Sequence, residues 1–400
     1  MKIVYLHQYF NTPDMVGGTR SYELARRLVA KGHEVEMVTS WRERDDRRDW
    51  FTSNEAGIKV HWLPVPYGNQ MSYRQRVAAF LRFAWGAARK AASLQADVVY
   101  ATSTPLTIAL PAVYAARRMR CPMVFEVRDL WPTVPIAVGA LRNPLTIWSA
   151  RKLERFAYRN ATRVVALSPG MAEGVAAAGY SAANIRVIPN SADLKMFSHD
   201  DEGAQRFRAA RPELDSRPII LYAGTFGLIN GVEWVVRLAV ESKLRALDCC
   251  FVLVGDGAEK EKVTRLAREL GVLGNNCFIY ESLPKSSIVD AFSASAVVVS
   301  TTIDLPELEA NSANKFFDGL AAGKTVAVNY GGWQAELIED YEVGMAWPRE
   351  PSQAADVLAD WFAQPDRLRV AGNNARQLAE GRFSRDLLAE QLERVLLEAV

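Results

Sequence analysis

The chain has 400 residues, of which 49% are hydrophobic and 24% charged, a composition typical of a globular protein with two or three domains. This composition excludes a disordered or fibrous chain. The four cysteines have no metal-ligand spacing, and two of them, Cys249 and Cys250, are adjacent and form a poor disulfide pair. A disulfide-rich fold is therefore excluded, and a reducing compartment such as the cytosol is favoured.

The net charge of +2 conceals a strong asymmetry along the chain. Residues 1–200 contain 27 Lys and Arg against 16 Asp and Glu, whereas residues 201–400 contain 21 against 30. Between Ala56 and Phe125 the single acidic residue is Asp97, beside nine basic ones. A basic half joined to an acidic half indicates that one domain meets an anionic surface or ligand.

Hydrophobic runs that alternate with helical patterns predict two successive β/α halves. After a first strand and helix at Ile3–His7 and Thr19–Lys31, the predicted strands of the first half are Glu34–Thr39, Ile58–Pro64, Val98–Ala101, Pro122–Glu126 and Val164–Leu167. Those of the second half are Pro218–Ala223, Cys250–Val254, Cys277–Tyr280, Ala296–Ser300 and Thr325–Asn329. This alternation predicts an α/β fold with two doubly wound parallel sheets. We place the domains at 1–196 and 197–400, with a linker near 193–208 and a last helix, about 385–400, that can pack back on the first domain.

Two apolar stretches are not interpreted as membrane or export signals. Met1–His7 is a strand and lacks the long apolar core of a signal peptide. Val98–Ala116 is uncharged but is interrupted by Thr102–Pro105, which predicts a strand followed by the start of a helix.

A segment at Glu309–Lys324 has the pattern of a nucleotide site. A polar loop leads into a short helix, whose N-terminal N–H groups and positive dipole end suit a diphosphate. Lys315 adds a cation in the first turn, and Asp318, one turn further on, can accept hydrogen bonds from two vicinal ribose hydroxyls. The alternative is an ordinary α/β crossover in which Gly323 ends the helix.

Several further segments resemble one known family. They are Leu6–Phe10 with Gly17–Arg20, Val127–Pro132, Val187–Asp193 with Phe197, Tyr222–Thr225, Val254–Gly257 and Asn314–Gly323. In this order they resemble the family 4 glycosyltransferases of the GT-B type, and among these the bacterial O-antigen and capsule transferases of N-acetyl-L-fucosamine.

This resemblance implies two Rossmann-like domains that face each other across a cleft, and a retaining enzyme. The implied reaction moves a sugar from a UDP-sugar to a lipid-linked glycan acceptor in surface polysaccharide synthesis. N-acetylated amino sugars and deoxyamino sugars are among the classes of sugar that it could transfer. The acceptor would be carried on polyprenyl diphosphate, so the protein would be cytoplasmic and peripheral on the inner face of the cytoplasmic membrane. No Asp-x-Asp occurs, so we expect no obligatory divalent metal. We also expect no other cofactor and no nucleic-acid partner. Two alternatives stay open: a sugar-nucleotide 2-epimerase of the same fold, and a non-catalytic sugar-nucleotide-binding protein.

The resemblance also implies which residues contact the donor, beginning with glycines. Gly17 and Gly18 match residues that let the backbone approach the diphosphate and the reacting sugar, unless they only form a flexible turn. Asn190 contacts the nucleotide or shapes the turn before the linker. Gly224 matches a donor-loop glycine, and Gly255 is interpreted as a structural turn near the base.

The cations of the donor loop are absent from their usual places. Many members of the family carry Arg and Lys where this chain has Thr225 and Asn230. Lys315 is the leading candidate to neutralise the diphosphate instead, with Arg20 or Arg128 as candidates from the first domain.

The paired glutamates of the family are also altered. Asp318 matches the second of them, the ribose ligand, but the first falls on Ala310, so the neighbouring Glu309 could serve only if the loop is shifted. The remaining contacts of this loop are expected from Asn311, Ser312 and Asn314.

Two residues of the first domain are candidates for work at the acceptor. Asp129 follows a strand and could orient the acceptor hydroxyl, or it pairs with Arg128 or caps a turn. His7 ends the first strand and is either a pocket residue or a satisfied buried histidine.

A basic segment with aromatic residues, Tyr73–Lys90, predicts a helix that lies on anionic lipid, or else a helix with an ordinary solvated face. On a helical wheel Val77, Phe80, Leu81, Ala84 and Ala88 share the core-facing side, and Phe83 falls near the basic side. The predicted membrane contacts are Arg74, Arg76, Arg82, Trp85, Arg89 and Lys90.

Overall fold

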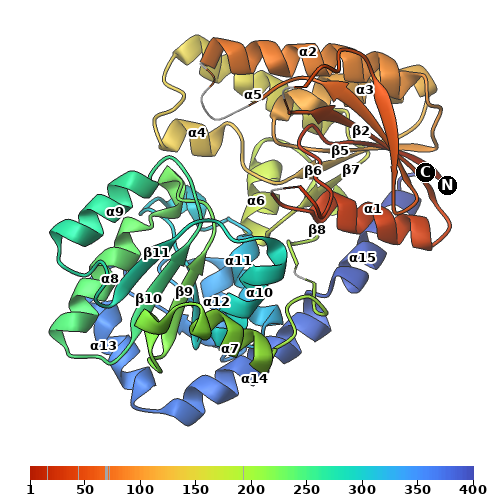
Figure 1. The fold of residues 1–400 in the computed structure, drawn as a ribbon. Coiled ribbons are helices and arrows are strands. Elements are labelled where there is room, and N and C mark those ends of the chain that lie inside the picture. The colour runs from red at the N-terminus through yellow and green to blue at the C-terminus, as the bar shows by residue number, and fades with distance from the viewer. Residues whose placement is uncertain (16, 44, 68–70, 72, 192) are drawn as a thin grey trace. The chain divides into compact units, whose positions relative to one another are not determined.

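The computed structural model describes residues 1–15, 17–43, 45–67, 71, 73–191 and 193–400, with the backbone alone at 73, 74, 76, 285 and 286. The chain divides into two compact units (Figure 1). The N-terminal unit comprises Met1–Pro189 and Arg385–Val400, and the C-terminal unit comprises Asn190–Ser384. The chain therefore crosses between the units twice, after Pro189 and after Ser384.

The N-terminal unit is built on an eight-stranded sheet in the order β3-β4-β2-β1-β5-β6-β7-β8, parallel except for β3, which pairs antiparallel with β4. Its strands are β1 (Lys2–Leu6), β2 (Glu34–Trp41), β3 (Phe51–Glu55), β4 (Ile58–Pro64), β5 (Val98–Thr102), β6 (Met123–Val127), β7 (Arg163–Ala166) and β8 (Ile185–Val187). The central strands β5 and β6 are fully buried and, apart from Thr102 and Glu126, hydrophobic, as expected of a parallel sheet that is covered on both faces.

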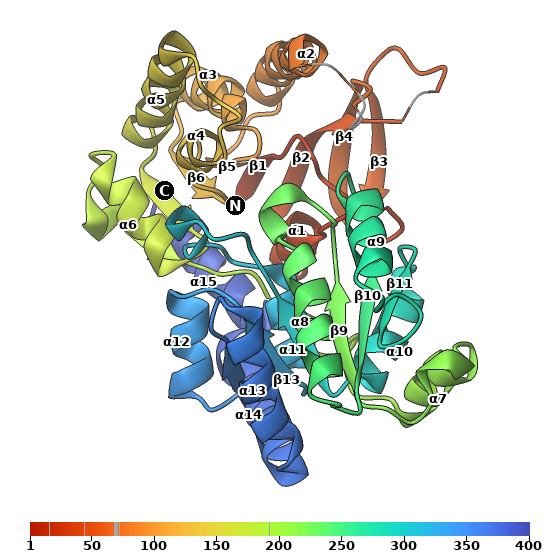
Figure 2. The same cartoon turned by 90° about the vertical axis from the view of Figure 1, so that its left-hand side faces the viewer.

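Helices cover both faces of this sheet (Figure 2). They are α1 (Arg20–Ala30), α2 (Tyr73–Ala92), α3 (Ala109–Met119), α4 (Thr133–Ala137), α5 (Pro144–Arg159), α6 (Pro169–Ala177) and α15 (Arg385–Leu397). On one face α1 and the C-terminal helix α15 pack together, and Leu24 and Leu388 join Ile3 in one core. On the other face α2 packs against α3, with α5 beside α3.

The C-terminal unit has a six-stranded, fully parallel sheet in the order β11-β10-β9-β12-β13-β14. Its strands are β9 (Ile219–Ala223), β10 (Cys250–Val254), β11 (Cys277–Tyr280), β12 (Val297–Ser300), β13 (Thr325–Val328) and β14 (Gly344–Ala346). From β9 the strands β10 and β11 follow toward one edge of the sheet, whereas β12, β13 and β14 follow from β9 toward the other edge. The carboxyl ends of β9 and β12 are therefore the switch point at which such sheets bind ligands.

Two separate cores hold the helices of this unit against its sheet. The helices are α7 (Asp201–Ala209), α8 (Glu233–Leu244), α9 (Lys260–Glu269), α10 (Lys285–Ala294), α11 (Asn314–Ala321), α12 (Trp333–Asp340), α13 (Pro351–Phe362) and α14 (Pro365–Arg382). Phe207, Phe292 and Phe316 from α7, α10 and α11 belong to one core. Val235 and Val263 from α8 and α9 belong to the other.

The predicted fold class is confirmed, and several predicted strands have the observed bounds, among them β4, β10 and β11. Three short strands, β3, β8 and β14, have no counterpart in the prediction. The predicted linker at 193–208 is wrong in part, because it overlaps α7, which begins after the N-cap Asp200 and buries Phe207. The first crossing lies after Pro189, against a predicted domain boundary after residue 196.

One buried ion pair joins distant parts of the N-terminal unit. The Arg20 guanidinium lies 2.9 Å from Glu126 Oε1, and the two side chains are 7% and 0% exposed. Arg20 also donates to the carbonyls of Ile188 and Pro189, while Tyr100 and Thr102 donate to the Glu126 carboxylate. The pair thereby connects the start of α1, β5, β6 and the segment by which the chain leaves this unit.

We expect Glu126→Gln to destabilise the N-terminal unit by about 3–5 kcal/mol, because Arg20 would keep a buried charge without its partner. Burial by itself raises the pKa of Glu126, but Arg20 and Arg128 outweigh it and the folded-state pKa is lowered from 4.5. The stabilisation is therefore present above pH 4.5 and is lost as the pH falls through the folded-state pKa. Urea unfolding followed by tryptophan fluorescence at pH 7 and at pH 4 measures both effects.

The matched control is Glu34→Gln, which removes an exposed carboxylate that pairs with Lys2. Exposed pairs contribute about 0–1 kcal/mol, so this variant should unfold nearly as the wild type does. Equal losses in the two variants would mean that the buried pair has no special role.

Candidate donor site and acceptor face

Lys315 lies in the first turn of α11, directly against the loop that follows β9. A Cβ added at Gly224 would lie 3.0 Å from Lys315 Cε, so the absent side chain of Gly224 makes room for the lysine. The ammonium lies 5.1 Å from the centroid of the Tyr222 ring. The structure thus brings Gly224 and Lys315, two predicted donor-site residues, together at the carboxyl edge of the sheet.

The Lys315 ammonium is electrostatically poised for an anion. Burial lowers the pKa of Lys315 to about 8, and the charge of Asp318, one turn further along α11, opposes that shift. The N-cap of α11 is Ala313, which provides no side-chain cap. The Phe316 N–H of the first turn donates to the Ala313 carbonyl over 3.1 Å. The start of a helix favours an anion, and the Lys315 ammonium belongs to this first turn.

The loop before α11 is fixed from two sides. The backbone N–H of Asn190 donates to Ser312 Oγ over 3.1 Å, and its side-chain amide donates to the Ser312 carbonyl over 2.7 Å. On the other side, Trp333 Nε1 donates to the Asn311 carbonyl over 2.7 Å. Asn190 Oδ1 is buried and has no partner among the described residues. Asn190 was predicted either to contact the nucleotide or to shape the turn before the linker. In the structure its hydrogen bonds hold the loop at Ser312.

Glu309 lies beside the turn between β13 and α12. A Cβ added at Gly331 would lie 3.1 Å from Glu309 Oε1, and one at Gly332 would lie 2.8 Å from the Glu309 carbonyl oxygen. The glycines at 331 and 332 therefore allow the 309–312 loop to approach this turn. Asn314, the first residue of α11, is exposed.

The turn at Gly255, which follows β10, packs directly against the Gly224 loop. A Cβ added at Gly255 would lie 1.9 Å from the Gly224 carbonyl oxygen, and Gly224 N–H donates to the Val254 carbonyl over 3.0 Å. The Thr225 carbonyl accepts hydrogen bonds from the Tyr222 hydroxyl and from the Asn230 amide. The Gly255 turn thus has a structural contact, and Thr225 and Asn230 hold the loop conformation through neutral groups.

A cationic residue that sequence reasoning missed lies near the same edge. Arg349, just after β14, donates to the Thr302 carbonyl over 2.9 Å and lies 3.4 Å from Asp304. It lines a pocket of about 550 Å³ together with Asn329 and with Gly227 and Gly231 of the loop after β9. A lone arginine after a three-residue strand carries no sequence signal of such a position.

In the N-terminal unit, three predicted residues meet at the carboxyl edge of the sheet. His7 follows β1 and is 3% exposed, and its Nε2 lies 3.4 Å from Arg128 Nη1. Burial, with the charges of Arg128 and Arg42, holds the pKa of His7 well below 6.5, so this imidazole is neutral at pH 7. Asp129 is exposed and accepts a hydrogen bond from Thr104 over 3.1 Å.

The glycine turn before α1 is held by Asn11. Gly17 has a φ of +130°, which a residue with a side chain rarely adopts, and a Cβ there would lie 2.5 Å from Asn11 Nδ2. Asn11 also donates to the Gly18 carbonyl over 3.2 Å. Arg20, which is also predicted at the donor, has other partners in the structure. Its guanidinium is already bonded to Glu126 and two carbonyls, so a diphosphate would have to break a buried ion pair to reach it.

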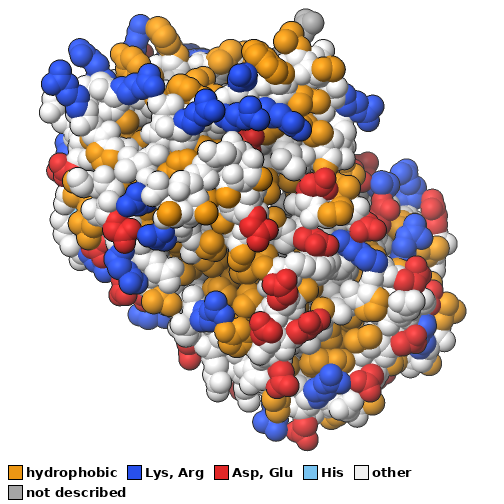
Figure 3. All heavy atoms as spheres, turned by 180° about the vertical axis from the view of Figure 1, so that it is seen from behind, with side chains coloured by type: hydrophobic (Ala, Val, Ile, Leu, Met, Phe, Trp, Pro, Cys, Tyr) orange, Lys and Arg blue, Asp and Glu red, His pale blue; other side chains and the backbone are white. Residues whose placement is uncertain are grey.

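The helices α2, α3 and α5 share a surface that we name the basic–aromatic face. Its exposed apolar side chains are Leu81, Trp85, Leu110, Tyr114, Leu145 and Trp148. Its exposed basic side chains are Arg82, Arg89, Arg117, Arg118, Arg151, Lys152, Arg155 and Arg159. The three helices contain one acidic residue, Glu154, which is buried. Figure 3 shows Lys and Arg side chains with hydrophobic ones along its upper part.

The helical wheel of α2 was wrong at two positions. Leu81 was expected in the core but is 54% exposed, and Phe83 was expected near the basic side but is 1% exposed. The buried stripe follows Ala79, Phe83, Ala87 and Ala91, so the helix is rotated relative to the prediction. Trp85 is 65% exposed beside Arg89, with Lys90 half-buried near Trp50. The side chains of Arg74 and Arg76 lie outside the described residues.

Two searches of the described residues gave negative results. None of the helices in those ranges combines the length and the apolar character that a membrane span requires. In the same ranges, no group of three or more His, Cys, Asp and Glu side chains is placed to hold a metal ion.

Comparison with known proteins identifies both units. Residues 17–191 match the family described as "Glycosyl transferase 4-like domain", and residues 204–378 match "Glycosyl transferases group 1". The chain is 24% identical over 295 residues to the glycosyl transferase WcaI of Escherichia coli K12, whose name assigns it to colanic acid biosynthesis, covering 68% of this chain and 71% of WcaI. It is 25% identical over 259 residues to the alpha-D-kanosaminyltransferase of Streptomyces kanamyceticus, covering 64% of each protein.

Solved structures match the fold over nearly the whole chain. Sucrose-phosphate synthase from Thermosynechococcus elongatus has a TM-score of 0.78 at 17% identity, covering 99% of this chain and 98% of that one. Anabaena HepE in complex with UDP-glucose has a TM-score of 0.73 at 17% identity, covering both chains completely. These likenesses confirm the GT-B fold.

The charge coupling on α11 gives a prediction that needs no ligand. Because Asp318 raises the pKa of Lys315, Asp318→Asn should lower that pKa below about 8. The pKa is measured from the pH dependence of the ¹³C resonance of the Lys315 ε-carbon. Lys324, whose pKa burial also lowers to about 8, lies at the far end of α11 and serves as internal control. A pKa that moves equally at both lysines, or at neither, would contradict the coupling.

Proposed function

Because the chain belongs to the family 4 glycosyltransferases of GT-B type, we propose that it transfers a sugar from a UDP-sugar to a lipid-linked glycan acceptor, with retention at the anomeric carbon. The observation that carries the donor part is the Lys315 ammonium, which lies against Gly224 at the uncapped start of α11. HepE, which shares the fold, was solved with UDP-glucose, and WcaI is named for a polysaccharide pathway.

In the proposed reaction, the bond between the anomeric carbon and the β-phosphate oxygen of UDP breaks. A bond from the acceptor oxygen to the same carbon forms on the same face, and the acceptor proton passes to the departing phosphate oxygen. Negative charge develops on the diphosphate, and Lys315 with the α11 N–H groups stabilises it. Such a route requires no strong protein base.

The other residues have supporting roles in this proposal. Asp318 accepts hydrogen bonds from the ribose hydroxyls, and the loop of Glu309, Asn311 and Ser312 contacts the diphosphate and the sugar. The Gly17–Gly18 turn allows close approach to the reacting sugar. Asp129 orients the acceptor hydroxyl, and the neutral His7 accepts a hydrogen bond from Arg128 and keeps it in place.

Turnover of purified protein with candidate UDP-sugars, with and without a polyprenyl-diphosphate-linked acceptor, tests this function. We expect UDP release that depends on the acceptor. An epimerised sugar nucleotide in the absence of acceptor would indicate the 2-epimerase instead. Binding of UDP without turnover on any acceptor would indicate the non-catalytic alternative.

Lys315→Ala should lower turnover about a hundredfold, since removal of one preorganised charge or donor at a developing anion has effects of this order. Lys243→Ala, on α8, removes a lysine that bonds the Gly271 carbonyl and should turn over normally. Adding Thr225→Arg to Lys315→Ala should restore part of the loss, because position 225 carries the cation in many family members. Normal turnover of Lys315→Ala would place the neutralising charge elsewhere, with Arg349 and Arg128 next to be tested.

For the acceptor, we propose that the basic–aromatic face rests on anionic lipid at the inner face of the cytoplasmic membrane. Exposed Trp and Tyr side chains among basic ones suit the lipid interface, and the face presents no exposed acidic side chain in the described part of α2, α3 and α5. In this proposal the lipid contact includes α3 and α5 as well as α2, because all three helices expose basic and aromatic side chains.

Reversing Arg82 and Arg89 to glutamate should weaken binding to anionic vesicles at least ~30-fold, because each basic residue near such a surface contributes about 1 kcal/mol. The matched control reverses Arg265 and Arg268, two exposed arginines on α9, and should bind as the wild type does. Vesicle co-sedimentation at low and high salt measures the difference. Equal sedimentation of both variants would mean that the face is only solvated.

A further inference from the structure

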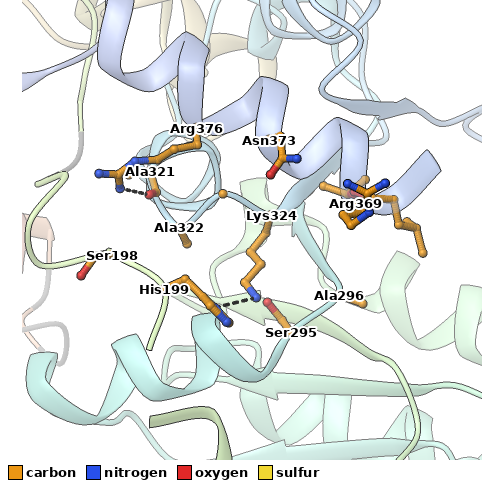
Figure 4. A pocket seen from close by; sticks show the side chains of 13 residues that line it. Ser198, His199, Ser295, Ala296, Ala321, Ala322, Lys324, Arg369, Asn373 and Arg376 are labelled. Carbon is orange, nitrogen blue, oxygen red and sulfur yellow. Dashed lines mark hydrogen bonds between the residues drawn. The ribbon is translucent and has the colours of Figure 1, made fainter. Parts of the chain in front are cut away.

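Figure 4 shows a second pocket of the C-terminal unit. It lies at the edge of the sheet where β12 and β13 begin, whereas Lys315 lies at the carboxyl edge. Its volume is about 450 Å³, and it is formed where α11 ends and where β12 and β13 begin. Lys315 is in the first turn of α11, whereas Lys324 follows the last turn of the same helix. Eight helical residues rise about 12 Å, so the pocket is separate from the donor site.

The lining of this pocket is basic. Among the described residues it has no acidic side chain, and it includes His199, Lys324, Arg369 and Arg376. Arg369, Asn373 and Arg376 have the helical spacing that places side chains on one side of α14. Arg376 is already bonded to the carbonyls of Ala321 and Leu194 and to Glu380, so we do not count it as available.

Lys324 has the position of an anion contact. Its ammonium donates to the Ser293 carbonyl over 2.7 Å and lies 3.3 Å from His199 Nδ1 (Figure 4). An ammonium has three donors, and the third has no partner within the described part of the chain. His199 Nε2 is bonded to Asp201, so the ring presents Nδ1 to the lysine as an acceptor. Neither of these two contacts pairs Lys324 with a carboxylate.

Capping alone does not account for this arrangement. Lys324 donates to the carbonyl of Ser293 near the C-terminus of α10, and this cap uses only one of the three N–H groups of the ammonium. Yet burial lowers the pKa of Lys324 to about 8, with Arg208 acting in the same direction and Asp201 opposing both. A surface lysine would cap the helix without this desolvation cost.

Tight backbone packing fixes the geometry of the pocket. A Cβ added at Gly372 on α14 would lie 2.4 Å from the Gly323 carbonyl oxygen, so α14 and the end of α11 touch through glycine. Ser198 and His199, which line one side of the pocket, follow the segment by which the chain enters this unit. Arg376 donates a hydrogen bond to the Leu194 carbonyl of that segment. The pocket is thus bounded by preformed elements.

We propose that this pocket binds the phosphate group of a small phosphorylated molecule, with Lys324 and Arg369 as its charged contacts and the Asn373 amide as a further donor. The exposed pair of Arg369 with Asp366, at 3.2 Å, holds the arginine only weakly and releases it readily. The remaining volume accommodates a group of about the size of a sugar. This proposal is independent of the donor site.

Inorganic phosphate is the probe, titrated into the ¹³C-lysine-labelled protein in the presence of saturating UDP. We expect a saturable shift of the Lys324 ε-carbon and a rise of its pKa above about 8, because an anion favours the charged form. Lys315 should respond to UDP and not to phosphate. The two lysines therefore report separately on this proposal and on the proposed function.

Arg369→Gln should weaken the phosphate response of Lys324 severalfold, without a core substitution that risks the fold. The matched control is Arg367→Gln on the same helix, whose guanidinium is bonded to Asp360. A Lys324 resonance that does not saturate with phosphate would overturn the proposal. So would equal effects of the two arginine variants, which would mean general ionic screening.

Discussion

The space left by the missing side chain of Gly224 is the constraint on which the donor site depends. It allows the Lys315 side chain to pack beside Tyr222 instead of extending into water. That position removes part of the hydration of the ammonium, and the lowered pKa of Lys315 is the consequence. A desolvated cation is costly in the empty protein and interacts strongly with an incoming diphosphate, so the site is preorganised for negative charge.

The surrounding loops are held in place by neutral hydrogen bonds and backbone packing, and not by ion pairs among the residues named here. Asn190 and Trp333 fix the loop before α11 through neutral hydrogen bonds, and the Gly255 turn supports the Gly224 loop through backbone contact. The N-terminal unit uses a cation differently. Arg20 is locked to Glu126 and stabilises the fold, whereas the exposed bases of α2, α3 and α5 have few acidic neighbours and are directed to solvent. Arginine thus stabilises the fold in one place and, in our proposal, contacts lipid in another.

Much of the fold could be predicted from the sequence, because fully buried parallel strands are continuous hydrophobic runs between turn residues. β10 is of this kind. β4 and β11 keep most of such a run, although β4 exposes Lys59 and the last two residues of β11 are half-buried. β14 has three residues, and β3 is an edge strand with alternating exposure and polar composition, so neither has a comparable run. The polar stretch that contains α7 looks like a linker, because one helical side, at Phe207, is enough to attach it to the core.

For the site, the Asn-Lys…Asp spacing indicated Lys315 and Asp318, since helical periodicity relates residues one turn apart. The role of Arg20 was not readable, because its partner Glu126 is 106 positions away in the chain. The rotation of α2, which buries Phe83 and exposes Leu81, depends on packing against α3 that the wheel does not contain. Arg349 follows β14 and Lys324 precedes β13, and no motif in the sequence assigns either of them the contacts they make in the structure.

A crystal structure of the protein with UDP tests the central claim most directly. We predict the diphosphate within hydrogen-bond distance of Lys315 Nζ and of the first-turn N–H groups of α11, with the ribose hydroxyls on Asp318. A diphosphate held by Arg349 or Arg128, with Lys315 still packed on Tyr222 and free of contact, would contradict it.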